Sequence, residues 1–537
     1  MIKARSVTAL AALALASCGG GSSSGVINNP TPTPSPSPTP TPTGAFSLFY
    51  STLLDGASGT TYEMARGMAI DAQGNIYVTG GTTAADFPTT AGAYSRTFGG
   101  NAGGSPTAVG AQGPGDVFVV KMSPAGKILW STLLGGPNYD RAYAIRVGSD
   151  GSVYVAGRAG PGFPTTTGVV QPNFAGDNGP TNEYGKQDGF VAKLSADGST
   201  LLWSTYIGDS DGAFIRDIDL DSQGRTYIGL AMITKPIPAL ITSNAWQPTM
   251  GDQQDDAYIR LSTDAKRVEY GTYLGGTAGA TGATTEVPSI RVASDGSVVV
   301  AFGEKGAGMI TSANAYQRQN AGGFDMAVVK FLANDTMSFS TYFGGSGDEN
   351  GETHFLALDS LGRVYITGTT NSSNLPVTAG TYQQRFGGGM NDGFLAVLSA
   401  DGSRLLASTY IGGNGVDPGQ GIEIAQKNGT PDSVVLSLSS SSTNIAGTAG
   451  AFQTTNQGGT DAAIAVLSTD LVSLRYLSFI GGSAEDAGRT LAISPDGSNL
   501  YIGGHTLSGN FPTTADAIDR QLNGTYAGWV AFFRANP

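Results

Sequence analysis

Thiols and imidazoles are scarce in this sequence. Its 537 residues include one cysteine, Cys18, and two histidines, His354 and His505. A single thiol cannot form an intramolecular disulfide, so the fold must be stabilised by packing. Because Cys18 stands in the N-terminal segment considered below, Cys–His catalysis is excluded. Two histidines also leave few bases for a Ser-His-Asp triad and too few ligands for a histidine metal site.

Charged residues and long apolar runs are also rare. Charged residues make up 13% of the chain, with 29 basic and 42 acidic residues, for a formal net charge of −13. An acidic surface repels phosphate backbones, which argues against nucleic acid as a partner. No segment approaches the ~18 consecutive apolar residues of a transmembrane helix. Eighty glycines indicate many turns rather than long amphipathic helices.

The first residues have the pattern of an export signal. Lys3 and Arg5 precede the short apolar segment 7–16, which ends in "LASC" with Cys18 last. That ending resembles the bacterial lipobox, in which cleavage precedes a cysteine that receives a lipid. We therefore predict a lipoprotein signal peptide at 1–17 and lipidation of Cys18. The alternative is an ordinary secretory signal with a coincidental cysteine.

A low-complexity linker follows at 18–44. It starts with Gly and Ser and continues as alternating Thr/Ser-Pro, a composition that favours extended polyproline II and stays solvated. Gly19 occupies the position where an aspartate would resemble an inner-membrane retention signal. We therefore expect an exported protein, lipid-anchored at the outer membrane or cell surface. Residues 45–537 are predicted to form the folded domain.

A repeated motif organises the folded domain. "STYIGG" at 408–413 has six relatives, spaced 67 to 80 residues apart. Each unit also contains a hairpin of two alternating strands, with a glycine such as Gly74, Gly224 or Gly362 at the turn, and a third strand that opens on aspartate. Four short antiparallel strands repeated seven times predict an all-β, seven-bladed β-propeller.

The aspartates that open the third strands form a repeated set. They were aligned as Asp116, Asp188, Asp256, Asp325, Asp392 and Asp461, with Ala527 as the counterpart in the seventh unit. A residue type repeated in six blades is expected to bond backbone amides at the turn rather than form a catalytic ring.

The combination "STYIGG…DSLGRVYITG…LPVTAGTYQ…DGFLAVLSADGS" resembles the bacterial β-propeller repeat family known as SBBP repeats. The resemblance covers 46–537 and weakens in units 4 and 6. It implies a propeller on an exported or surface protein and does not imply a reaction. The domain begins with a fourth-type strand at 46–54 and ends with a third-type strand at 528–533, so we expect these two to pair and close the ring.

One constellation predicts a functional surface. Aligning the first strands of the units places polar side chains at equivalent positions, and the loops before them are acidic. Because these loops converge around the propeller axis, we predict a mixed-charge binding rim at the channel mouth. Its residues are Arg66, Asp140, Tyr143, Asp211, Arg216, Asp348, Glu352, His354, Gln420, Glu485 and Arg489. The alternative is a solvated ring of loops with no ligand.

No cofactor is predicted. The loop "GDSDG" at 208–212 has carboxylates at alternate positions but lacks a complete calcium-loop pattern, so adventitious Ca²⁺ is the alternative to a solvated acidic loop. We predict a monomeric, non-enzymatic protein that binds an unknown protein or glycan and meets the membrane only through its lipid. The alternative is a propeller enzyme, a lyase or glycan hydrolase, with its site at the channel mouth.

Overall fold

A computed structural model describes residues 46–57, 62–101, 113–176, 184–251, 253–276, 284–306 and 308–536. The predicted signal peptide, Cys18 and the linker at 18–44 lie outside the described residues. Within the described ranges, no helix combines the length and apolar character needed to cross a membrane. Two short 3₁₀ helices, η1 (Gly99–Asn101) and η3 (Pro238–Leu240), interrupt a fold made of strands.

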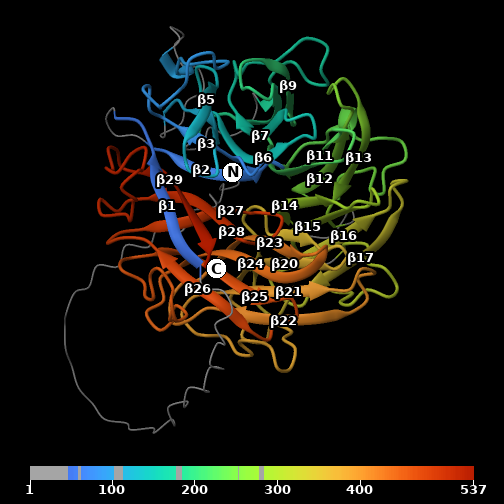
Figure 1. Cartoon of the computed structure of the whole chain (residues 1–537). Helices are drawn as coiled ribbons and strands as arrows, with labels where there is room; N and C mark the ends of the chain where they lie inside the picture. Colours follow the sequence, from blue (N-terminus) through green and yellow to red (C-terminus); the bar gives the residue numbers. More distant parts are fainter. Residues whose placement is uncertain are drawn as a thin grey trace, which may run out of the picture. The chain divides into compact units, whose positions relative to one another are not determined.

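The strands form seven antiparallel sheets, which are the blades of a propeller (Figure 1). Blade 1 contains β2 (Met64–Ile70), β3 (Ile76–Thr82), β4 (Asp116–Met122) and β5 (Ile128–Leu134). Blade 2 contains β6 (Arg141–Val147), β7 (Val153–Ala159), β8 (Asp188–Leu194) and β9 (Leu201–Ile207). Blade 3 contains β10 (Phe214–Leu220), β11 (Thr226–Ile233), β12 (Asp255–Leu261) and β13 (Val268–Leu274).

The remaining blades keep the same order, except that blade 5 has a divided first strand. Blade 4 contains β14 (Thr284–Val292), β15 (Val298–Lys305), β16 (Phe324–Phe331) and β17 (Met337–Phe343). Blade 5 contains β18 (Glu349–Asn350), β19 (Leu356–Leu358), β20 (Val364–Thr370), β21 (Asp392–Leu398) and β22 (Leu405–Ile411). Blade 6 contains β23 (Gly419–Lys427), β24 (Thr430–Ser440), β25 (Asp461–Ser468) and β26 (Leu474–Ile480). Blade 7 contains β27 (Asp486–Ile493), β28 (Asn499–Thr506), β29 (Ala527–Ala535) and β1 (Phe46–Leu54).

Both faces of each blade are covered, which is why the strands are apolar with few exceptions. In β3 and β7 every residue is buried. The first strand of each blade contacts the first strands of its neighbours, as β2 contacts β27 and β6, so the first strands surround the central channel. The hairpins between first and second strands carry glycines in the left-handed region, with φ of 79° at Gly74 and 72° at Gly362, as predicted.

The N-terminal strand closes the ring, as the terminal motifs predicted. β1 pairs with β29 in a register that runs from Phe46↔Ala535 to Leu54↔Gly528, and Figure 1 shows the blue β1 beside the red β29. Tyr50, Leu53 and Leu54 are buried in this blade. At about 1.5–3 kcal/mol for each large buried side chain, this pairing contributes on the order of a typical domain's net stability.

The "STYIGG" motif is architectural. Tyr410 and Ile411 are consecutive in β22 and both are buried, so opposite faces of the strand are covered. The two glycines do not adopt a left-handed conformation, because neither has a positive φ. They are required for space: a Cβ on Gly412 would lie 2.5 Å from the Asp392 side chain, and one on Gly413 would lie 2.2 Å from Asn444.

The aspartates that open the third strands bond backbone amides, as expected. Asp392 accepts a hydrogen bond from the N–H of Gly387 at 2.6 Å, and Asp325 accepts one from Ala321 at 2.8 Å. In blade 3 the alignment was one residue off. Asp255, which accepts the N–H of Gly251, is the equivalent residue, because a register shift in β11 displaces Asp256.

Candidate functional site

Each uninterrupted first strand carries a bulge, and the bulge selects the side chain presented to the channel. The pairing register shifts between Ala65 and Gly67, so Arg66 has no partner on β3. Bulges re-aim side chains in this way, often beside binding sites. The same register shift leaves the residues predicted for the rim without a partner on the second strand of their blade, and these are Tyr143, Arg216, Gln420 and Arg489. In β14 the shift leaves Val287 and Pro288 without a partner.

Blade 5 departs from this pattern. Its first strand is broken, and the segment Gly351–Phe355 links β18 to β19. His354 has a φ of 58°, in the left-handed region. The side chain of His354 reaches blades 2 and 3, and Ile422 of blade 6 donates its N–H to the His354 carbonyl at 3.1 Å. The segment therefore crosses the channel and connects blades on different sides of it.

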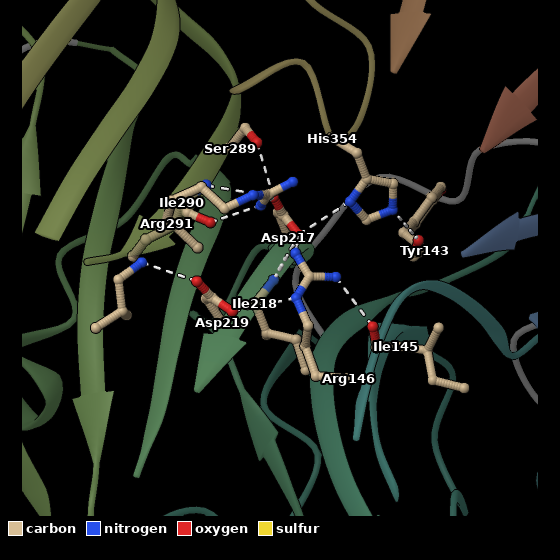
Figure 2. A network of polar contacts seen from close by, with 11 residues as sticks. Tyr143, Ile145, Arg146, Asp217, Ile218, Asp219, Ser289, Ile290, Arg291 and His354 are labelled. Carbon is tan, nitrogen blue, oxygen red and sulfur yellow. Dashed lines mark hydrogen bonds and ion pairs between the residues drawn. The ribbon is translucent and has the colours of Figure 1, made fainter. Parts of the chain in front are cut away.

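Asp217 lies at the centre of one network inside the channel (Figure 2). Its carboxylate receives Arg291 Nη1 at 2.5 Å, Arg146 Nη2 at 3.1 Å and His354 Nδ1 at 3.0 Å. Ser289 Oγ also donates to Asp217, at 2.7 Å. We call Asp217, Arg146, Arg291 and His354 the Asp217 network. It lies toward the hairpin mouth, which is the channel end where first strands turn into second strands.

The charges of the Asp217 network are compensated within the protein. Asp217 is fully buried, and Arg146 also bonds Asp219 at 3.2 Å. Burial alone would raise the pKa of Asp217, but Arg291, His354 and Arg146 hold it well below its ordinary value. Two arginines therefore face two aspartates, with every oxygen of Asp217 bonded. This arrangement fixes four blades together and leaves neither oxygen of Asp217 free for a ligand.

A second cluster lies at the loop mouth, the channel end where connections from fourth strands reach the next first strands. Glu352 lies 3.5 Å from Arg66 Nη1, 3.6 Å from Arg216 Nη1 and 3.5 Å from Arg489 Nη1. These arginines come from blades 1, 3 and 7. The Glu352 side chain is 37% exposed, but its Oε2 atom, the one nearest Arg66 and Arg216, is buried. Burial would raise the pKa of Glu352, but Arg66, Arg489 and Arg216 lower it to about 2.

Two more arginines border this group around Tyr143. Arg141 Nη2 donates to the Tyr143 hydroxyl at 2.6 Å, and the Arg158 guanidinium lies 5.3 Å from the Tyr143 ring centre. Arg216 lies 4.7 Å from the same ring. Cation–π contacts of this kind hold guanidinium groups without neutralising them. Burial raises the pKa of Tyr143, but Arg141, Arg158, Arg216 and Arg66 outweigh it and lower the value to about 7.

Five arginines lie together at the loop mouth, and we call them the arginine cluster: Arg66, Arg141, Arg158, Arg216 and Arg489. Their summed positive charge exceeds the negative charge of the carboxylates described near them. Glu352 is the carboxylate at their centre, and burial together with Arg489 and Arg141 lowers the pKa of Arg66 to about 10. Within the described part of the chain, the Nε atoms of the other four are buried without a hydrogen-bond partner. The cluster can therefore donate further hydrogen bonds to an anion.

Gln420, His505 and Glu485 lie at the edge of the arginine cluster. Gln420 Oε1 accepts a hydrogen bond from Arg489 at 3.3 Å. His505 lies 3.3 Å from Glu485 through its Nε2. Burial lowers the pKa of His505 to about 4, and Arg489 and Arg66 add to that effect against the opposing contact with Glu485.

Four predicted rim residues do not join the cluster: His354 belongs to the Asp217 network, and three carboxylates bond elsewhere. Asp140 is buried and accepts the N–H groups of Gly136 and Gly160. Asp348 accepts the N–H of Phe324 at 3.0 Å. Asp211 lies 3.4 Å from Lys235, on a loop beside the mouth. Carboxylates in these loops bond local donors, whereas the bulge residues and Glu352 converge.

The acidic loop at 208–212 is organised by its own backbone rather than solvated throughout. Asp209 is buried, and its two oxygens accept four N–H groups, those of Asp211, Gly212, Thr234 and Lys235. Among the described residues, no group of three or more His, Cys, Asp or Glu side chains is arranged to hold a metal ion.

The repeat alignment did not predict Arg141 and Arg158. These residues pair across β6 and β7. Arg158 occupies the position of Gly81 in blade 1, Thr369 in blade 5 and His505 in blade 7. This replacement is a signal in the sequence: blades 2 and 7 carry an ionisable side chain where blades 1 and 5 have a small one.

Comparison with known proteins agrees with this architecture. The SBBP model, described as a beta-propeller repeat, matches residues 50–88 and 339–376. The regulatory protein FlaEY of Caulobacter vibrioides is 24% identical over 344 residues, which cover 61% of this chain and 31% of FlaEY. The chain thus spans about a third of the length of that curated relative.

Solved propellers of low sequence identity also align with the chain. A polysaccharide lyase described as an ulvan lyase is 9% identical, with a TM-score of 0.41 over 86% of this chain and 93% of its own. The Neurospora crassa Pan2 WD40 domain is 9% identical, with a TM-score of 0.42 over 93% of this chain and 98% of its own. From the family match and the seven sheets, the chain carries repeats of the SBBP beta-propeller family on a seven-bladed ring.

Proposed function

We propose that this propeller is a non-enzymatic binding protein that takes an anionic group of a protein or glycan partner at the loop mouth of its channel. The observation that carries the proposal is the convergence of Arg66, Arg216 and Arg489, from three blades, on the single carboxylate of Glu352. Placing several arginines together at the loop mouth, with a single carboxylate between them, lowers the stability of the protein. Recognition of an anion is the function this cost supports.

The proposal is tested with anionic probes of two classes, oligogalacturonate and oligoglutamate. At least one is expected to bind by isothermal titration calorimetry, with an affinity that falls as salt rises. Replacing Arg66, Arg216 and Arg489 together by glutamine is expected to weaken binding at least 100-fold. Binding that is equally strong in the triple variant, or equally strong for uncharged probes, would overturn the proposal.

A lipid anchor at Cys18 and an exported, membrane-attached location complete the proposal. Their support is the export-type sequence before Cys18 and the Thr/Ser-Pro linker after it. Metabolic labelling with a clickable fatty acid, followed by membrane fractionation, tests both. Label that persists in a Cys18→Ala variant would show that the lipid is attached elsewhere, and a wild type without label would show that the protein is not lipidated.

The alternative function is a propeller lyase or glycan hydrolase at the same mouth. The observation that favours it is Tyr143, whose pKa of about 7 suits a general base. Against it, the Tyr143 side chain is fully buried, so its hydroxyl cannot contact a substrate without rearrangement. Incubation with oligogalacturonate separates the two functions, because a lyase yields an unsaturated, ultraviolet-absorbing product and a binding protein returns the probe intact.

A further inference from the structure

Two side chains that line a pocket beside the arginine cluster, Arg158 and Gln187, have buried polar atoms with no partner among the described residues. The pocket has a volume of about 120 Å³ and lies between blades 2 and 3 at the loop mouth. Arg158, Gln187, Asp211 and Thr234 supply its polar groups, and Phe214 and Met232 supply apolar walls. Gln187 and Arg158 are each more than nine-tenths buried.

Among the described residues, Arg158 is a buried cation without a counterion. Its guanidinium lies 4.4 Å from the ring centre of Phe214 and 4.7 Å from that of Tyr184, and no ion pair or hydrogen bond joins it to another described residue. Burial, together with the charges of Arg141 and Arg216, lowers the pKa of Arg158, against the opposing effect of Tyr143. A buried guanidinium in this setting is stabilised by an incoming carboxylate, which accepts two parallel N–H bonds.

Whereas Arg158 needs a hydrogen-bond acceptor, the side chain of Gln187 needs a hydrogen-bond donor. Its Nε2 donates to three backbone carbonyls, those of Tyr139, Tyr184 and Lys186, which fixes the orientation of the amide. The amide oxygen, Oε1, is buried and accepts no hydrogen bond from any described residue. A ligand that satisfies the pocket must therefore donate a hydrogen bond to Gln187 while it accepts hydrogen bonds from Arg158.

Asp211 adds a second acceptor at the pocket wall. Its charge is offset by Lys235 Nζ at 3.4 Å, so it does not cancel the charge of Arg158. Hydroxyl groups are the donors that suit both acceptors, and the apolar walls suit the carbon-bound face of a sugar ring. A compact ring that carries one carboxylate and several hydroxyls meets all of these requirements, whereas a peptide carboxylate supplies no hydroxyl.

We infer that this pocket is the subsite for a uronic-acid unit, so that the anionic partner is a carboxylated glycan. The inference rests on the proposed function and specifies its ligand. The carboxylate of the uronate pairs with Arg158, and its ring hydroxyls donate to Gln187 and Asp211. The neighbouring arginines of the cluster then meet the next acidic unit of the glycan.

The test compares oligogalacturonate with its carboxyl-reduced counterpart and with oligoglutamate of equal charge, all by calorimetry on the full chain. Oligogalacturonate is expected to bind, and the reduced oligosaccharide at least tenfold more weakly. Arg158→Gln is expected to weaken oligogalacturonate binding at least tenfold. Arg267→Gln removes the same charge at a side chain that is 74% exposed, and it is expected to bind like the wild type.

A second variant guards against misfolding of Arg158→Gln. Thr234→Trp fills the pocket and leaves all five arginines in place, and the same loss of oligogalacturonate binding is expected. If oligoglutamate binds and oligogalacturonate does not, the uronate inference fails and the proposed function stands. If both variants bind oligogalacturonate like the wild type, the subsite lies elsewhere and the inference also fails. If neither anionic probe binds, the proposed function fails together with the inference.

Discussion

At the hairpin mouth of the channel, two arginines meet two aspartates, and at the loop mouth three of five clustered arginines contact one carboxylate, Glu352. First strands supply most of both sets: Arg216 belongs to the arginine cluster and the next residue, Asp217, centres the other network. Blade 5 connects the two through one segment, with Glu352 in the first and His354 in the second.

The Asp217 network and the arginine cluster differ in how far their charges are compensated rather than in the types of residue that they contain. Asp217 is fully buried and every one of its oxygens is bonded, so its network holds blades together. Glu352 is partly exposed, and its three contacts are 3.5 to 3.6 Å long. Compensated charge in a dry interior fixes structure, whereas uncompensated charge in contact with solvent is available to a ligand.

Asp217→Asn should produce the largest loss of stability. It leaves Arg146 and Arg291 buried with reduced compensation, and breaking a buried pair in this way costs about 3–5 kcal/mol. The measurement is urea denaturation followed by tryptophan fluorescence. As a matched control, Asp264→Asn removes an exposed carboxylate paired with Lys266, and it should change stability far less. Equal effects of the two variants would mean that the Asp217 network is not structural.

Lowering the pH should reduce the stability of the wild type more than that of Asp217→Asn. This difference is smaller than the loss caused by the substitution itself. The folded pKa of Asp217 is well below its unfolded value, so its stabilisation is present above about pH 4 and is lost as pH falls further. Between pH 6 and pH 3 the wild type should therefore lose about 1 kcal/mol more than the variant.

The third-strand aspartates have the opposite pH dependence and provide an internal control. Burial raises the pKa of Asp116, Asp325 and Asp392 to about 7, so their contribution is full below about pH 4 and is lost as pH rises through 7. This effect is common to the wild type and Asp217→Asn and cancels in their difference. Identical pH profiles for the two proteins would contradict the role of Asp217.

Glu352→Gln should have the smallest effect on stability of these substitutions, and it should strengthen the binding of anionic probes. Because the side chain is 37% exposed and its ion pairs are 3.5 to 3.6 Å long, its loss should cost less stability than Asp217→Asn. Removing the resident negative charge should also raise the affinity for anionic probes several-fold. Calorimetry and urea denaturation on the same variant measure both quantities, and a large destabilisation without a gain in affinity would place Glu352 with the Asp217 network.

The sequence predicted the ring because each blade repeats its own local chemistry. The repeat alignment also found the bulge residues Arg66, Tyr143 and Arg216, since a bulge recurs at one position in each unit. It could not show that Gly351–Phe355 leaves the sheet, because nothing in that stretch excludes an ordinary strand. Asp140 was placed at the rim on charge alone, although two backbone N–H groups use its carboxylate.

Arg158 was overlooked for a different reason. The resemblance to the repeat family weakens in units 4 and 6, which draws attention to those blades. The informative change is the additional charged residue, Arg158, in blade 2, which is a regular unit. Substitution of a small repeat position by a charged residue is visible in sequence, but its meaning depends on Arg141, its partner on the neighbouring strand. Pairing across strands assembles the cluster.

Bromide tests most directly whether the loop mouth holds uncompensated positive charge. Crystals of the protein soaked in bromide and measured at the bromine absorption edge reveal where a small anion collects. We predict an anomalous peak among Arg66, Arg141, Arg158, Arg216 and Arg489, and none at Arg146 or Arg291. A peak at Asp217 with none at the loop mouth would contradict the account.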